Sequence, residues 1–187
     1  MKKLTPIAAL AAACLMATSA QAFELSESFI NVGVTENQLN ALDFDNSGNL
    51  GFALESSRLY KPDPQSPLRL GWSSSFNYVL LSPLADVNLD DDGLFNVDFL
   101  AVGAYSFKEN NDIPAILFAG AGYGFGLIGS IPTNGFVYKV GGKFDFSDNI
   151  GVTAEYRHIS LGFDSIYDET SFGDGMDTLG LYLSINF

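Results

Sequence analysis

Cysteine is almost absent from this sequence, since Cys14 is the only one among 187 residues. A single thiol cannot form a disulfide within the chain, so the fold must rely on hydrogen bonding and packing. Long apolar runs are also missing after residue 22. A membrane-spanning helix needs about 20 consecutive apolar residues. The sequence therefore excludes such a helix beyond that point.

Basic residues are scarce: 9 Lys and Arg stand against 22 Asp and Glu, for a net charge of −13. This balance excludes nucleic acid as a natural partner, because the phosphate backbone binds basic surfaces. Yet the chain is 47% hydrophobic and contains 16 Phe and 8 Tyr. A soluble domain with so much charge would rarely carry so many aromatic residues. Both properties are explained if the charges lie in loops and the aromatic side chains face lipid.

The first 22 residues have the three parts of a secretion signal: two lysines, an apolar run and a small-residue cleavage site. We predict cleavage after Ala22, which leaves residues 23–187 as one domain. Lipoprotein processing at Cys14 is an alternative, but the residues before it lack the usual leucine. Loss of both lysines leaves seven basic residues against 22 acidic ones, a net charge of −15.

Eight segments of β-type composition follow, separated by Pro, Asp, Asn and Gly. Apolar side chains alternate along them; Phe95, Val97 and Phe99, for example, share one face. Eight is an even number, and each segment is long enough to cross a bilayer at a tilt. The predicted strands are 26–35, 49–60, 67–80, 94–107, 115–128, 135–146, 149–162 and 178–187.

The connections between these strands also alternate in length. Long, acidic connections at 36–48, 81–93 and 163–177 alternate with short ones, although the connection at 129–134 breaks the pattern because it is short. Short periplasmic turns and longer external loops are typical of outer-membrane barrels. An amphipathic sheet over a soluble core would show the same alternation, but the secretion signal and the lack of helices favour lipid. We predict an all-β fold, an eight-stranded antiparallel up-and-down transmembrane β-barrel in the outer membrane of a Gram-negative bacterium.

Residues 139–157 and the final segment 179–187 resemble the small OmpA-type and YfaZ-type outer-membrane barrels. The resemblance covers the last third of the chain well and the rest only in pattern. It implies that the terminal Phe187 is an assembly signal read by the barrel-assembly machinery. It does not imply an activity, because this fold carries unrelated functions.

The alternation also predicts which charged residues point inward. An eight-stranded barrel has an interior that side chains can fill, and buried charges there must pair. Four acids and four bases form a balanced set, so we predict a plugged lumen with at most limited passage of small solutes. The predicted lumen charges are Glu55, Arg69, Asp98, Lys139, Lys143, Asp145, Glu155 and Arg157.

The segment 115–128 carries glycine at positions 120, 122, 124 and 126, all on one face. Glycine weakens a strand, so such a row has a steric purpose. The glycines could make room for long lysine and arginine side chains, or they could line a small cavity or water path. Periodicity alone leaves both interpretations open.

His158, the only histidine, shares the lipid-facing side of its strand with Ser160. This pair resembles the His-x-Ser element of outer-membrane lipid A deacylases, in which a downstream Glu completes a lipid-facing triad. Glu169 is the acid of that type available here. The residues after Ser160 depart from the deacylase pattern, however. We therefore predict that the chain has no catalytic residue and that His158 belongs to the interfacial aromatic girdle, with the triad of His158, Ser160 and Glu169 as the alternative.

Asp43, Asp45 and Ser47 resemble the first half of a calcium loop. The twelfth position of that loop is Leu54 instead of an acid, and an acidic hairpin turn explains the run equally well. No motif for a nucleotide, a zinc ion or a hydrolase elbow occurs. We expect no bound cofactor beyond loosely held divalent cations.

The sequence leaves three functions open. The first is a non-enzymatic barrel with a structural or surface-interaction role, in contact with outer-membrane lipid and lipopolysaccharide. The second is a lipid A acyl-ester hydrolase that uses His158 and Ser160. The third is ion or ligand binding by the acidic external loops.

Overall fold

The computed structural model describes residues 24–39, 49–80, 93–128, 131–160, 162–163 and 175–187. The four strands of the first half are β1 (Glu24–Leu39), β2 (Asn49–Lys61), β3 (Leu68–Val79) and β4 (Leu94–Ser106). A one-turn helix, α2 (Lys108–Asn111), precedes β5 (Ala115–Ile128) and β6 (Ile131–Asp145). The chain continues as β7 (Ile150–Ile159), β8 (Gly162–Phe163) and β9 (Met176–Asn186).

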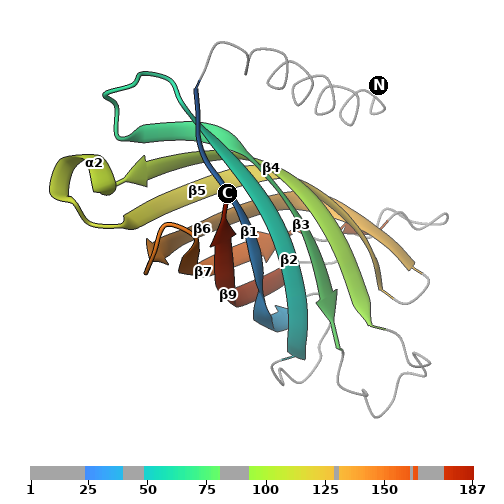
Figure 1. Ribbon diagram of the computed structural model, residues 1–187. Helices are drawn as coiled ribbons and strands as arrows, with labels where there is room; N and C mark the ends of the chain where they lie inside the picture. Colours follow the sequence, from blue (N-terminus) through green and yellow to red (C-terminus); the bar gives the residue numbers. More distant parts are fainter. Residues whose placement is uncertain (1–23, 40–48, 81–92, 129–130, 161, 164–174) are drawn as a thin grey trace, which may run out of the picture.

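These strands form one closed sheet (Figure 1). Neighbours are antiparallel in the order β5-β4-β3-β2-β1-β9-β7-β6, and β5 also pairs with β6, which closes the barrel. The two-residue β8 pairs with β6 just beyond the last β7 pair, so β7 and β8 occupy one place in the barrel. The predicted closed, eight-stranded antiparallel barrel is confirmed.

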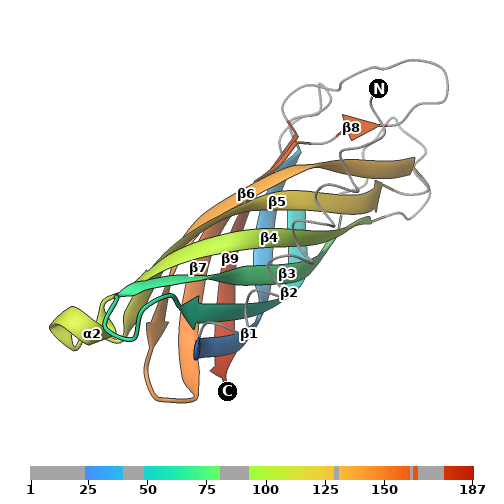
Figure 2. The ribbon, with the colours of Figure 1, turned by 90° about the horizontal axis from the view of Figure 1, so that it is seen from above.

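The two ends of the barrel differ (Figure 2). The C-terminus, α2 and the hairpin between β6 and β7 lie at one end, and β8 lies at the other. We call these the turn end and the loop end. The three connections described at the turn end are short, as the sequence predicts for periplasmic turns.

Strand boundaries differ from the prediction mainly where the alternation is weak. β1 extends from residue 24 to 39 and not from 26 to 35, and β6 begins at Ile131 and not at 135. Pro132 therefore lies in the ladder, opposite Leu127, and not in a connection. Among the described residues Pro132 has a ladder partner only on the β5 side, so it lies at an edge, where its missing N–H is tolerated.

Side chains alternate between an apolar outer face and a mixed interior. Leu179, Leu181 and Leu183 of β9 are each more than half exposed, and Phe52 and Phe136 are similarly exposed. An exposed, mainly apolar belt of this kind matches the lipid-facing surface of a transmembrane barrel. No helix in the described segments is long and apolar enough to cross a membrane.

Candidate functional site

The structure places the predicted lumen charges inside the barrel. Seven of the eight are at most 4% exposed, and Asp145, near the turn end, has a side chain that is 21% exposed. They do not form one network, however. Contacts among them and with other polar residues divide them into a central cluster and two smaller clusters near the turn end.

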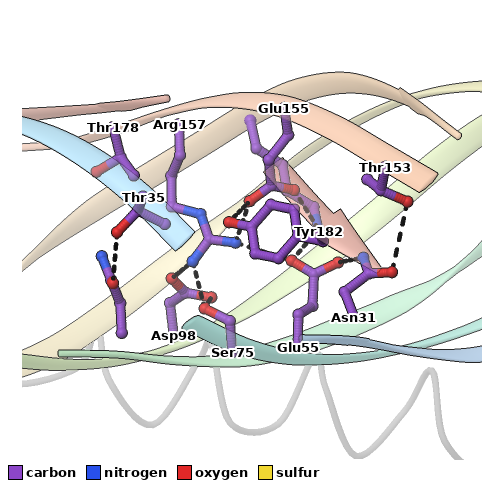
Figure 3. Close-up of polar contacts among 12 residues, drawn as sticks. Asn31, Thr35, Glu55, Ser75, Asp98, Thr153, Glu155, Arg157, Thr178 and Tyr182 are labelled. Carbon is purple, nitrogen blue, oxygen red and sulfur yellow. Dashed lines mark hydrogen bonds and ion pairs between the residues drawn. The ribbon is translucent and has the colours of Figure 1, made fainter. Parts of the chain in front are cut away.

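The central cluster is organised around the guanidinium of Arg157, which projects from β7 across the lumen (Figure 3). One of its terminal nitrogens lies 2.8 Å from Asp98 Oδ2 and also donates to Ser75. The other lies 2.8 Å from Glu55 Oε2 and 2.6 Å from Glu155 Oε1. Arg157 therefore joins β2, β3, β4 and β7 through charge-assisted hydrogen bonds.

Lys139 supplies the second positive charge of this cluster. Its Nζ lies 2.7 Å from Glu55 Oε2 and 3.6 Å from Glu155 Oε2. The Tyr182 hydroxyl donates to Glu155 at 3.0 Å, and the Asn31 amide donates to Glu55 at 3.3 Å. The central cluster therefore has three acids and two bases, and neutral donors complete it.

Buried apolar side chains lie on both sides of the central cluster along the barrel. On β4, Leu94 lies toward the loop end from Asp98, whereas Leu100 and Val102 lie toward the turn end. All three are at most 5% exposed. On β7, the buried Ile159 lies two residues beyond Arg157, toward the loop end. Within the described residues, apolar layers thus flank the charges along the barrel.

The other predicted charges pair near the turn end. Arg69 lies 2.5 Å from Glu109 of α2, and Lys61 also pairs with Glu109. Lys143 lies 2.6 Å from Asp145. Sequence reasoning did not assign Glu109 or Lys61 to the interior set, because Glu109 lies in α2 and Lys61 is the last residue of β2, beyond the predicted strand. The eight predicted charges therefore do not pair among themselves as one balanced set of four acids and four bases.

The Glu109 cluster yields a prediction with a defined pH dependence. The hydrogen bond from Lys61 holds the pKa of the Glu109 carboxyl below its usual value, and the bond from Arg69 lowers it further. A lowered pKa stabilises the folded state above the unfolded pKa, and this stabilisation is lost as the pH falls through the folded pKa. Glu109→Gln should reduce the free energy of unfolding by about 0.2–1 kcal/mol at neutral pH, because the pair is partly exposed.

Urea unfolding across acidic to neutral pH checks this. The wild type and Glu109→Gln should converge at low pH, where a protonated Glu resembles Gln. Glu36→Gln, which changes an exposed acid of β1 that has no ion pair among the described residues, is the matched control. A constant difference between the wild type and Glu109→Gln at every pH would contradict the assigned charge effect.

The glycine row of β5 faces the interior, and neighbouring atoms occupy the space beside it. A Cβ at Gly124 would lie 2.9 Å from Val137 Cγ2, and one at Gly120 would lie 3.6 Å from the Lys139 stem. At Gly122 and Gly126 the nearest atoms are backbone oxygens of β4. The steric interpretation therefore applies at all four positions, although only Gly120 adjoins a long charged side chain.

A second polar cluster lies on the outer face, toward the loop end. His158 Nδ1 is 2.7 Å from Asp177 Oδ1, and the two residues are direct partners between β7 and β9. The Tyr156 hydroxyl donates to the same oxygen at 2.5 Å, and the Tyr138 ring stacks on the imidazole at 4.8 Å between centroids. The side chains of His158 and Asp177 are 16% and 28% exposed.

Ser160 follows on the same outer face, two residues after His158, and its side chain is exposed. Its N–H donates to the Phe136 carbonyl at 2.8 Å, which fixes the backbone at the end of β7. The Ser160 hydroxyl makes no hydrogen bond to His158 in the described structure. A carboxylate that holds one imidazole nitrogen leaves the other for a nearby hydroxyl, which is the arrangement of a hydrolytic triad.

The carboxylate that contacts His158 is Asp177, which sequence reasoning had not considered. Glu169, the predicted acid, lies outside the described residues, so its predicted role is untested. Asp177 was missed because the final strand was predicted to begin at 178, whereas β9 begins two residues earlier at Met176. The register between β7 and β9 would have identified Asp177 as the partner of His158. That register could not be derived from the sequence, because a long connection separates the two strands.

The remaining predicted sites are only partly visible. Phe187 is 77% exposed, and its N–H donates to the Ser28 carbonyl at 2.9 Å, which holds the C-terminus against β1. Asp43, Asp45, Ser47 and the secretion signal lie outside the described residues. Within the described part, no group of three or more His, Cys, Asp or Glu side chains could hold a metal ion.

No protein family and no curated protein matches this sequence. Solved structures do match. The attachment invasion locus protein Ail of Yersinia pestis has 17% identity and a TM-score of 0.56, with 86% of this chain and 98% of that chain covered. The outer membrane enzyme PagL has 16% identity and a TM-score of 0.54, with 86% and 99% covered. Neisserial surface protein A has 14% identity and a TM-score of 0.51, with 85% and 95% covered.

These likenesses establish the fold and no finer relationship. The chain has the fold of the eight-stranded outer-membrane β-barrels, and this fold carries different functions in different proteins. The resemblance to OmpA-type and YfaZ-type barrels stays a prediction.

Proposed function

We propose that this chain is an integral outer-membrane barrel whose lumen is sealed and whose function lies on its exposed surfaces. The apolar outer belt supports a lipid environment, and the solved structures with the same fold include an outer membrane enzyme and an attachment protein. Its partners are outer-membrane lipid and lipopolysaccharide. The barrel-assembly machinery recognises the terminal strand through Phe187.

The observation that carries this proposal is the central cluster. Arg157, Lys139, Glu55, Asp98 and Glu155 are all at most 4% exposed, and each is within ion-pair distance of an opposite charge. Ions this deeply buried are costly unless they remain paired. Opening a path would separate those pairs, so the closed state is strongly favoured. The cluster therefore supports a structural or surface-interaction role in place of transport.

Planar-bilayer recording tests the sealed lumen. The purified wild type should produce no stable, nanosiemens-scale openings, because paired charges and apolar layers fill the barrel. A larger porin added to the same bilayers provides the positive control for detection. Reproducible, steady conductance from the wild type would refute the sealed-lumen proposal.

A second candidate function is favoured by the outward cluster of His158 and Asp177. As a lipid-facing acyl-ester hydrolase, the barrel would use Ser160 Oγ to attack an ester carbonyl while His158 Nε2 accepts the hydroxyl proton. The imidazolium returns that proton to the departing alcohol, and water then hydrolyses the acyl-serine. Asp177 orients the imidazole. The missing contact between Ser160 and His158 is compatible with this role, because catalytic hydrogen bonds are often long without substrate.

His158 and Ser160 lie toward the loop end, which is the external end in this proposal. The substrate of such an enzyme would therefore be an ester-linked acyl chain of lipid A in the outer leaflet. The lipid A acyl pattern of cells with and without the protein separates the two candidates. If the acyl pattern is the same with and without the protein, the surface role alone is supported. If an acyl chain is lost only when the protein is present, the hydrolase activity is supported as well.

A further inference from the structure

The basic residues of the described chain are distributed unevenly. Arg58 of β2 is the only one that projects from the lipid-facing side of the strands. The other six lie in the lumen or near the turn end: Lys61, Arg69, Lys108, Lys139, Lys143 and Arg157. An exposed guanidinium among mainly apolar outward side chains requires an explanation, because charge on this face is unfavourable.

Polar and aromatic neighbours surround Arg58. Its direct partners across the ladder are Ser28 on β1 and Trp72 on β3, and the guanidinium carbon lies 5.7 Å from the Trp72 ring centroid. Ser56 shares its face two residues away and pairs with Ser74. We call these five residues the Arg58 notch.

The notch has donors but no acid. No carboxylate among the described residues forms an ion pair with Arg58. The indole ring fixes the cation by a cation–π contact, which does not neutralise its charge. An anion is therefore the missing partner of the notch.

Depth in the membrane limits which anion this is. Arg58 lies three residues before Lys61, the last residue of β2, at the turn end. At about 3.3 Å per residue and a tilt near 40°, that is roughly 8 Å of membrane depth. A strand of 13 residues exceeds the apolar band, which is about 25 Å tall, by several Å at each end. Arg58 thus lies close to the periplasmic boundary of the hydrocarbon, where a long side chain reaches the headgroups.

We propose that the Arg58 notch binds the phosphate of an anionic glycerophospholipid in the periplasmic leaflet. The guanidinium fork matches two phosphate oxygens, and the serine hydroxyls can donate to others. A lipid with net negative charge is preferred over a zwitterionic one, because no headgroup ammonium competes with Arg58. The proposal depends on the membrane placement in the proposed function but not on a sealed lumen, so bilayer conductance would not affect it.

Trp72 is the only tryptophan of the chain and lies in the notch, so its fluorescence reports lipid contact directly. The full barrel is folded into phosphatidylcholine vesicles that contain brominated phosphatidylglycerol or brominated phosphatidylcholine. Quenching by the two lipids yields a relative binding constant. The wild type should favour phosphatidylglycerol at least about threefold at fixed salt, since the charge-assisted contact is partly desolvated.

Arg58→Gln should reduce this ratio to about one, Arg58→Lys should restore part of it, and Lys108→Gln should leave it unchanged. For each variant, quenching by brominated phosphatidylglycerol is divided by quenching by brominated phosphatidylcholine. A change in the surroundings of the indole ring affects both signals and therefore cancels in the ratio. If Arg58→Gln fails to fold, the pair Ser56→Ala and Ser74→Ala, which should reduce the ratio partially, replaces it. A wild-type ratio of one, or a ratio that Arg58→Gln does not reduce, would overturn the proposal.

Discussion

Replacing Arg157 with methionine is expected to destabilise the barrel by about 3–5 kcal/mol, the largest effect of any lumen substitution. Arg157 contacts Glu55, Asp98 and Glu155 within 2.8 Å. Its removal leaves three carboxylates at most 4% exposed with Lys139 as the only base in the central cluster. The decrease in the free energy of unfolding therefore comes mainly from the buried carboxylates left without a positive partner, and less from the loss of the ion-pair attractions. Equilibrium urea unfolding in phospholipid vesicles, followed by Trp72 fluorescence, measures it.

Two further variants separate charge from packing. Arg58→Met removes an arginine from the lipid-facing side and should change stability by no more than about 1 kcal/mol. Adding Asp98→Asn and Glu55→Gln to Arg157→Met removes two of the uncompensated charges and should recover part of the loss, since these residues are energetically coupled. If the combined variant is as unstable as Arg157→Met, the cost comes from the cavity and not from uncompensated charge.

The alternation of side chains was sufficient to predict the fold. The segment 94–107 differs by one residue from β4, because every second residue in it is apolar and outward-facing. The start of β6 was predicted four residues too late because Pro132 was interpreted as a loop signal. Pairing with β5 overrides that local signal and extends the strand to Ile131.

The side of the barrel on which a residue lies was predictable, whereas its partner was not. Arg157 and Asp98 belong to β7 and β4, which are not neighbours in the sheet, and they meet only across the closed lumen. Which residues meet there depends on strand tilt and stagger, which alternation does not specify. The contact between the Tyr182 hydroxyl and Glu155 could likewise not be derived from the sequence.

Ser160→Ala is expected to abolish loss of an acyl chain from lipid A, if the outward cluster is the active site of the second candidate function. In that case cells with the wild type show lipid A shortened by one ester-linked acyl chain, and cells with Ser160→Ala show the full pattern. Asp177→Asn should lower the rate by as much as about 10⁴-fold, because the amide favours the wrong imidazole tautomer. His158→Phe should remove activity completely, since Ser160 loses its base. Mass spectrometry of extracted lipid A measures all four.

Folding must be monitored in parallel, because Asp177 also accepts the Tyr156 hydroxyl and could act only structurally. Heat-modifiable migration on gels verifies that each variant forms a barrel, and Ser56→Ala, an outward serine on β2, should retain full activity. A phenylalanine at 158 keeps an aromatic ring against Tyr138, so His158→Phe preserves the interfacial packing while it removes the proton acceptor. Identical lipid A from cells with the wild type and cells without the protein would reject the hydrolase. His158 would then belong to the aromatic girdle, with Asp177 and Tyr156 as its polar partners.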